Sequence, residues 1–428
     1  MPWPHALRSL RHRNLRLFFG GQAVSLTGSW TQSVAQGWLV WRLTHSPEML
    51  GLVGFLSQLP VFLFGVWAGA LADRFPRRTV VLVTQVNALV QAALLAALTF
   101  GGWVRPWHIL VLSFMLGLSY AFEIPARQAL LGDVAGEDMP NALALNSSIV
   151  NGARVAGPAV AGALLALWGE AWCFALNALS YLATLRALLV MDLPPQRPPA
   201  GRTRLAGGLD YAARTPYVRA LLSLLAVSAF FGMSYGALLP VFAADVLGGG
   251  PGLYASLQVC AGTGALAGGV SLLLRPGGLS GLGRRVAVGA SALGLGLLVA
   301  SRSRVPALTG ASLLLAGFGY VTQAAGTMTL LQGLAPVELR GRVMGLFSTL
   351  FLGMTPFGAL LGGLAARRLG APATLLAGSS VVLCASVALH VRLPALGRSL
   401  RAARAAAAPS PASPPPPGPP PAPPLPTA

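Results

Sequence analysis

Apolar segments separated by short polar turns run along almost the whole chain. A helix needs roughly 20 apolar residues to cross the ~30 Å hydrocarbon core of a bilayer, and segments of that length recur when small and occasional polar residues are allowed. The pattern predicts an all-α membrane protein with twelve transmembrane helices paired into hairpins. The expected spans are residues 15–39, 49–72, 79–100, 107–129, 142–168, 171–191, 218–242, 252–274, 286–302, 306–331, 343–366 and 371–392.

The polar stretch after the sixth span divides the chain into two sets of six helices. It contains several prolines and arginines and is typical of a linker at a membrane surface. After Arg404 the sequence turns to alanine and then to near-continuous proline, which cannot form a packed core. We therefore predict a six-helix bundle over residues 1–191, a cytoplasmic linker over 192–217, a second six-helix bundle over 218–395, and a disordered Ala/Pro-rich cytoplasmic tail over 396–428.

A weak internal repeat relates the two predicted bundles. A shift of 200 positions aligns Tyr120 with Tyr320, and it sets Glu123 against Gln323, a side chain of nearly the same shape without the charge. The fourth span is thus echoed by the tenth, which favours two pseudo-symmetric halves. Internal repeats of this kind in transporters place the substrate site at the interface between the halves.

The distribution of charge sets the expected orientation. The chain is 54% hydrophobic and only 10% charged, with a net charge of +19. Its arginines gather between alternate spans, and most fall on the side of the two chain ends, which the positive-inside rule assigns to the cytoplasm. We expect a multi-pass protein of the bacterial cytoplasmic (inner) membrane with both termini inside. No nucleic-acid partner is expected, because nucleic-acid binders concentrate their charge on one solvated face.

Polar residues follow one face of the first span. Gln22, Ser25, Ser29, Gln32 and Gln36 recur at steps of three and four, which places them on a single helical face. Such a stripe would be costly in lipid, so it faces either a cavity or the polar groups of partner helices. We predict a mostly apolar cavity, which suits broad selectivity, lined by Gln22, Ser29, Gln36, Tyr120, Tyr320 and Gln323, with aromatic walls such as Trp30 and Phe231.

Glu123 is the acid that the pattern places well inside a span. A carboxylate in the membrane is a functional candidate because its ionised form is expensive there. Arg127 lies one turn further along the helix and can pair with it, and Arg154 in the fifth span is a second cation that could compete for the same carboxylate. Exchange between these partners would couple proton binding to helix movement. A permanent structural ion pair is the alternative.

An acid and three arginines interrupt the apolar pattern between the second and third spans. Gly69 lets neighbouring helices approach closely, and Asp73 can answer the positive N-terminal end of another helix. Arg74, Arg77 and Arg78 can pair with acids or phosphate head groups. This composition indicates a loop that gates the cytoplasmic side of a membrane transporter, with a solvated basic turn as the alternative.

The loop resembles the signature loop of the major facilitator superfamily. Residues 38–40, 43–47, 125–128 and 142–147 further resemble the bacterial branch that contains enterobactin exporters and macrolide efflux proteins, and the resemblance covers roughly residues 8–395. It implies the major facilitator fold and alternating access by rocking of two six-helix halves. It also implies that Asp73 and its arginines lock the cytoplasmic ends against the start of the eleventh span.

The fifth span resembles the antiporter motif of the same superfamily at Gly157, Pro158 and Gly162. That resemblance implies export in exchange for protons. Ser29 stands where many exporters of this branch carry an acid, and Pro76 stands where the signature loop usually has glycine. The departure at Ser29 shifts the expected proton coupling from the first span to Glu123.

These features favour a proton-coupled exporter of small amphipathic molecules, drug-like or siderophore-like. A lipid flippase or an importer of the same fold is the alternative. A membrane-embedded enzyme would need a clustered nucleophile, metal ligands or a phosphate-binding loop, and the sequence carries no motif for these. We expect no enzymatic activity, no cofactor and no metal, and a monomer whose partners are a small-molecule substrate, protons and the lipid bilayer.

Overall fold

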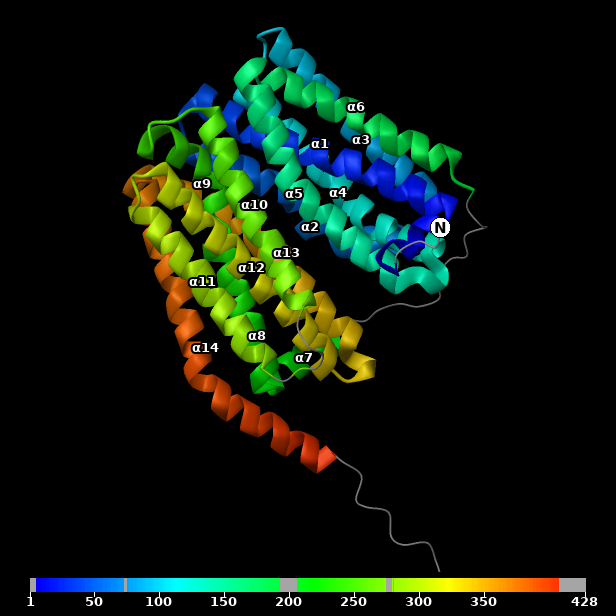
Figure 1. Ribbon diagram of the computed structural model, residues 1–428, viewed down its shortest axis with the longest axis vertical. Helices are drawn as coiled ribbons and strands as arrows, with labels where there is room; N and C mark the ends of the chain where they lie inside the picture. Colours follow the sequence, from blue (N-terminus) through cyan, green and yellow to red (C-terminus); the bar gives the residue numbers. More distant parts are fainter. Residues whose placement is uncertain (1–4, 73–74, 193–205, 275–278, 280, 408–428) are drawn as a thin grey trace, which may run out of the picture.

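Long helices make up the protein. The computed structural model describes residues 5–72, 75–192, 206–274, 279 and 281–407, and this part of the chain contains helices and no strands (Figure 1). The first half consists of η1 (His5–Arg11), α1 (Arg13–Thr44), α2 (Pro47–Ala72), α3 (Arg77–Phe100), α4 (Pro106–Ala135), η2 (Gly136–Asp138), α5 (Met139–Leu167) and α6 (Glu170–Val190).

The second half begins with a short helix and repeats the same up-and-down course. Its elements are α7 (Ala206–Arg214), α8 (Pro216–Val227), η3 (Ser228–Gly232), α9 (Tyr235–Val241), η4 (Phe242–Val246), α10 (Pro251–Leu273), α11 (Leu282–Arg302), α12 (Pro306–Leu334), α13 (Val337–Leu369) and α14 (Ala371–Ala407).

Each predicted span coincides with a long helix or, for the seventh, with the run from α8 to η4. By length and hydropathy, nine stretches within the described residues could cross a membrane, and the stretch Pro106–Leu167 contains both α4 and α5. The helices α1 and α12 are long enough but less apolar, because polar residues such as Gln32 and Gln323 interrupt them. The predicted all-α membrane fold with twelve spanning helices is confirmed.

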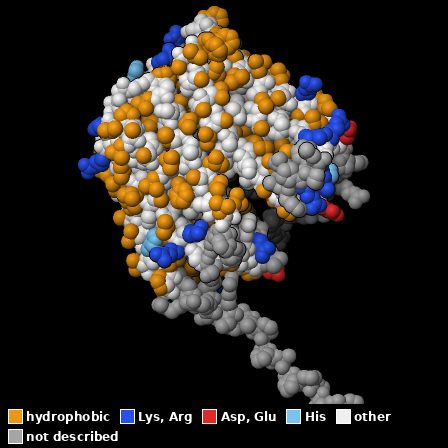
Figure 2. Space-filling view, in the orientation of Figure 1, with side chains coloured by type: hydrophobic (Ala, Val, Ile, Leu, Met, Phe, Trp, Pro, Cys, Tyr) orange, Lys and Arg blue, Asp and Glu red, His pale blue; other side chains and the backbone are white. Residues whose placement is uncertain are grey.

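The flank of the bundle is apolar. Figure 2 shows hydrophobic side chains spread across the helices, and Leu179, Leu273 and Val391 are more than 60% exposed. A continuous apolar surface of this kind is unfavourable in water and suits contact with lipid chains.

The first described helix, η1, and the last residues of α14 lie at the same end of the bundle, which we call the terminal end, and the opposite end is the distal end (Figure 1). At the terminal end, Asp138 binds the Arg8 and Arg11 guanidinium groups at 3.1 and 3.2 Å, which ties η1 to the start of α5. At the distal end, Arg367 on α13 donates to both carboxylate oxygens of Glu48 on α2, at 2.8 and 2.6 Å. This pair joins the two halves.

Contacts between the halves concentrate from the middle of the bundle to the distal end. On α2 and α13, a Cβ at Gly51 would lie 2.5 Å from the carbonyl oxygen of Ala359, and the rings of Phe55 and Phe357 pack edge to face. The rings of Trp38 on α1 and Tyr254 on α10 stack with centroids 6.2 Å apart. Figure 2 shows a hollow between the halves at the terminal end.

Two segments differ from the predicted boundaries. The helix α14 continues to Ala407, so the predicted disordered tail over 396–428 is wrong for its first twelve residues, where alanine and arginine favour a helix until the prolines begin. The predicted linker contains α7. Residues 193–205 and 408–428, and with them half of the linker and the proline-rich tail, lie outside the described part of the chain.

Candidate functional site

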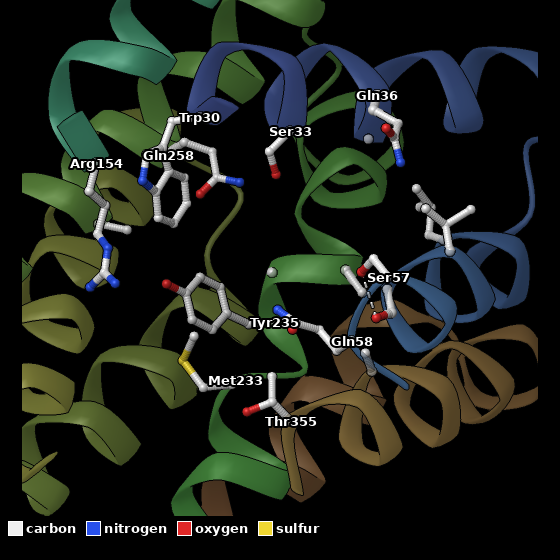
Figure 3. A pocket seen from close by; sticks show the side chains of 18 of the residues that line it. Trp30, Ser33, Gln36, Ser57, Gln58, Arg154, Met233, Tyr235, Gln258 and Thr355 are labelled. Atoms are coloured by element: carbon white, nitrogen blue, oxygen red, sulfur yellow. Dashed lines mark hydrogen bonds between the residues drawn. The ribbon is translucent and has the colours of Figure 1, made fainter. Parts of the chain in front are cut away.

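A cavity of about 390 Å³ lies between the two halves near the middle of the bundle (Figure 3). Helices α1, α2, α4, α5 and α6 line it from one half, and α9, α10, α12 and α13 line it from the other. Its wall is mostly apolar or aromatic, and its polar groups include hydroxyls and amides. The polar or aromatic lining residues include Ser29, Trp30, Gln32, Ser33, Gln36, Ser57, Gln58, Tyr120, Arg154, Tyr235, Tyr254, Gln258, Tyr320 and Thr355.

Five of the eight residues predicted for the cavity line it, and three lie elsewhere. Ser29, Trp30, Gln36, Tyr120 and Tyr320 are at its wall. The other three are Gln22, Phe231 and Gln323.

Gln22 and Gln323 are each held by a hydrogen bond to another helix that the sequence pattern does not reveal. The amide of Gln22 donates to Asn146 Oδ1 at 2.7 Å, towards the terminal end. The amide of Gln323 donates to the carbonyl oxygen of Leu224 at 3.3 Å, because α12 packs against α8. Phe231 packs on Phe230 with ring centroids 4.7 Å apart.

The polar stripe of α1 is held largely by hydrogen bonds between helices. Gln32 donates to Gln91 at 3.0 Å and accepts from Asn177 at 2.8 Å, while Gln36 donates to Ser113 at 2.9 Å. Both interpretations of the stripe therefore apply, since Gln32 and Gln36 also border the cavity. These bonds fix the rotation of α1.

Two glutamines at the cavity are not among the predicted lining residues. Gln58 on α2 and Gln258 on α10 both line it, and the 200-position shift that pairs Tyr120 with Tyr320 also pairs these two residues. The repeat thus carried a signal: an isolated glutamine at corresponding places in two apolar spans. The cavity thus has one tyrosine and one glutamine from each half at positions related by the repeat.

A break in the seventh span supplies two more lining residues. Two π-helical turns, η3 and η4, flank α9, and Met233 and Tyr235 sit at the first break, facing the cavity (Figure 3). Wider π-helical turns inside α-helices are frequent at functional sites. The nearby Gly236 and Pro240 are the sequence features that could have indicated this break, because glycine and proline disfavour a continuous helix.

Arg154 lies at the junction of the cavity and the contact between the halves. Pro158 cannot donate the backbone hydrogen bond that the Arg154 carbonyl would otherwise accept, and the α10 backbone approaches that carbonyl so closely that a Cβ at Gly262 would lie 2.6 Å from its oxygen. The Arg154 guanidinium lies 5.3 Å from the Trp30 ring centroid. No described residue forms an ion pair with Arg154, so in this conformation Glu123 pairs with Arg127 alone.

The antiporter-motif glycines serve packing on both sides of α5. A Cβ on Gly157 would overlap Trp30 on α1, and Thr31 donates to the Gly157 carbonyl at 3.1 Å. A Cβ on Gly162 would lie 2.9 Å from that of Ala255 on α10. Through these two glycines α5 contacts its own half and the opposite half.

Glu123 lies in a separate small cavity of about 20 Å³, space for about one water molecule. Its side chain is 3% exposed, and Oε1 accepts from Arg127 at 3.2 Å. The side chains of Gln22 and Gln85 border the same cavity, and Glu123 Oε2 and the two amide oxygens have no hydrogen-bond partner. A proton on Oε2 would convert one of these three acceptors into a donor.

The gate-loop residues are described only in part. Arg77 forms an ion pair with Asp133 at the end of α4, and Arg78 donates to the carbonyl oxygen of Leu189 at 2.9 Å. Gly69 lies within α2, and Asp73 and Arg74 lie outside the described residues. Arg77 and Arg78 therefore fasten α3 to α4 and α6.

Two six-helix halves around a central cavity, with polar groups facing it inside an apolar exterior, define a membrane transporter. The chain matches the family described as transmembrane secretion effector over residues 5–413 and belongs to this family of the major facilitator superfamily. It is a multi-pass membrane protein of a family whose members are transporters.

Curated relatives include both siderophore and drug transporters. The chain is 28% identical over 263 residues to the staphyloferrin A transporter of Staphylococcus aureus, spanning 59% of this chain and 65% of that protein. It is 28% identical to the multidrug efflux pump Tap of Mycolicibacterium fortuitum, covering 85% and 91% of the two chains. It is 29% identical to the enterobactin exporter EntS of Escherichia coli, covering 83% and 86%.

Solved structures share the fold at low sequence identity. The peptide transporter POT aligns with a TM-score of 0.72 and 14% identity, covering 90% of this chain and 95% of that one. A bacterial homologue of the lysosomal transporter Spinster, in an inward-facing and unoccupied conformation, aligns with a TM-score of 0.63 and 16% identity, covering 91% and 96%. These likenesses establish the major facilitator fold.

Proposed function

We propose that this protein exports small amphipathic molecules across the bacterial inner membrane in exchange for protons, by alternating access of the central cavity. The observation that carries the proposal is the central cavity between the halves together with a separate buried carboxylate at Glu123. A mostly apolar cavity with few polar groups suits amphipathic ligands. The relatives named as exporters of a siderophore and of drugs agree with outward transport.

The terminal end is assigned to the cytoplasm. Arginines such as Arg8, Arg11, Arg77 and Arg78 lie there, and the positive-inside rule applies to the short loops between spans. The contacts between the halves at the distal end and the hollow at the terminal end then correspond to an inward-facing state. In that state a molecule from the cytoplasm can reach the cavity. We further propose that the protein works as a monomer.

We assign binding and release of the transported proton to Glu123. Its carboxylate is buried beside Arg127, and a buried charge is costly unless it is paired. Protonation releases Arg127 and lets Glu123 Oε2 donate to one of the two unpaired amide oxygens, whereas deprotonation restores the ion pair. The site is bordered by α1, α3, α4 and α6 of the first half, so each change of charge alters the packing of this half.

Transport into inverted membrane vesicles tests the proposal. Energised vesicles that contain the protein are expected to accumulate members of a panel of anionic and cationic amphipathic dyes, and a protonophore should abolish this accumulation. Vesicles without the protein are the control. Unchanged accumulation after collapse of the proton gradient contradicts proton exchange. Uptake in right-side-out vesicles instead identifies an importer, and movement of labelled phospholipid between leaflets identifies a flippase.

The ion pair at the distal end is expected to bias the conformational equilibrium. Replacing Glu48 with arginine places two like charges where α2 meets α13, so it should raise the distal-open population several-fold; exposed pairs contribute up to about 1 kcal/mol, and repulsion adds to that loss. Spin labels at His45 and Leu369, both exposed at this end, report the distance in a variant whose native cysteines are serine.

A charge swap provides the control for that measurement. The double variant Glu48→Arg with Arg367→Glu restores the pair and should restore the distance distribution. If the single variant leaves the distribution unchanged, the pair does not hold the distal end closed.

A further inference from the structure

The central cavity contains a positive charge without a matching negative one. Among the described residues that line it, Arg154 has a formal charge and none is an aspartate or glutamate. Its guanidinium makes no hydrogen bond or ion pair with the described residues, and its buried Nε atom has no partner. Arg154 is half-buried, and a cation even partly removed from water without a counter-charge is costly.

Aromatic groups surround this guanidinium. The indole of Trp30 lies beneath it at 5.3 Å, and Figure 3 shows the phenol of Tyr235 beside the pair. Tyr320 lines the same cavity as Tyr235. A cation–π contact offsets part of the cost of desolvation but leaves the planar donors of the guanidinium unused.

The donors at this place suit an anion with an attached ring. Arginine can bind a carboxylate, sulfonate or phosphate through two parallel hydrogen bonds, and the Tyr235 hydroxyl and the Gln258 amide, both at the cavity wall, can add neutral donors. The rings of Trp30 and Tyr320 offer apolar surface for the rest of the molecule. A cationic ligand would meet an unscreened like charge instead.

We propose that Arg154 forms an anion subsite in the central cavity and that the cargo is an amphipathic anion, carrying a carboxylate or a similar oxyanion beside an apolar or aromatic group. This inference rests on the proposed transport function and specifies its substrate class. The Arg154 carbonyl faces Gly262 of the opposite half, so an anion bound by the side chain sits where the halves meet. Occupancy is thereby linked to the contact that must open during transport.

Equilibrium binding to the purified full-length protein tests the subsite. The probes are a series of naphthyl- and phenylalkanoic acids with their matched primary amides and amines, and the readout is the concentration that gives half of the maximal shift in melting temperature. We expect at least one acid to bind about tenfold more tightly than its amide, and the amines to bind more weakly than the amides, as charge-assisted hydrogen bonds to a half-buried arginine predict.

Variants separate the subsite from general effects on the fold. Arg154→Gln should remove the preference for the acid while binding of the amide persists, and Arg154→Lys should retain part of it because lysine supplies the charge without the planar fork. Arg186→Gln is the matched control, since Arg186 is an exposed arginine of α6 that does not border the cavity; it should leave the preference unchanged.

Two results would overturn the inference: no acid in the series binds more tightly than its amide in the unmodified protein, or the preference survives in Arg154→Gln. The binding measurement uses no proton gradient. Failure of proton exchange in vesicles therefore leaves the anion preference standing, and loss of the preference leaves the transport result standing.

Discussion

Replacing Glu123 with glutamine is expected to abolish accumulation of cargo against its gradient while leaving cargo exchange across the membrane intact. Glutamine keeps the shape of the side chain but cannot bind and release a proton, and it resembles the protonated acid. Alternating access continues, but each cycle no longer carries a proton. Cargo uptake driven by a pH gradient in proteoliposomes measures the first effect, and counterflow without a gradient measures the second.

The control for this variant is Glu137→Gln. Glu137 lies exposed in η2 at the terminal end, away from the small cavity, so the same chemical change there should leave both activities near those of the unmodified protein. Full gradient-driven transport by Glu123→Gln would exclude Glu123 from proton coupling and leave its contact with Arg127 as a structural ion pair.

Adding one methyl group at Gly157 is expected to destabilise the protein and to weaken cargo binding. In Gly157→Ala the new Cβ overlaps Trp30, so α1 and α5 must separate, and the hydrogen bond from Thr31 to the Gly157 carbonyl lengthens. Overpacking of this kind costs about 1–3 kcal/mol. Because Trp30 lines the cavity, its displacement also disturbs the wall that contacts cargo. Melting temperature and cargo affinity are the two measurements.

Gly152→Ala is the matched control on the same helix. A Cβ at Gly152 would meet no atom within 4 Å, so that variant should keep its stability and its affinity. Equal melting temperatures for the two variants would show that the close approach of α1 to α5 at Gly157 is not a source of stability.

The twelve spans could be predicted because the membrane imposes one length on all of them. The hydropathy signal is weakest in α1 and α12, where polar residues face other helices instead of lipid. The seventh span shows a further limit. Its length and composition suggest one continuous helix, whereas the structure breaks it with two π-helical turns that pack against helices of the same half, and Tyr235 of α9 between them lines the cavity.

The candidate site followed the sequence only in part. Periodicity placed Ser29 and Gln36 on one face with Gln22, but the face is long, and its terminal part packs against Asn146. The repeat identified Tyr120 with Tyr320 and could have identified Gln58 with Gln258. It also suggested Gln323 as a cavity residue, which the contact with Leu224 removes from the wall.

The sequence by itself determined the membrane class, the two-half course of the chain, the uneven distribution of the arginines between alternate loops and the pairing of Glu123 with Arg127 one helical turn away. These depend on local spacing and on the bilayer, which act on each segment alone. Only the tertiary structure decided that Arg154 faces the central cavity while Glu123 occupies a separate one. That separation depends on which helices meet, because a helical pattern defines a face but does not specify the surface that covers it.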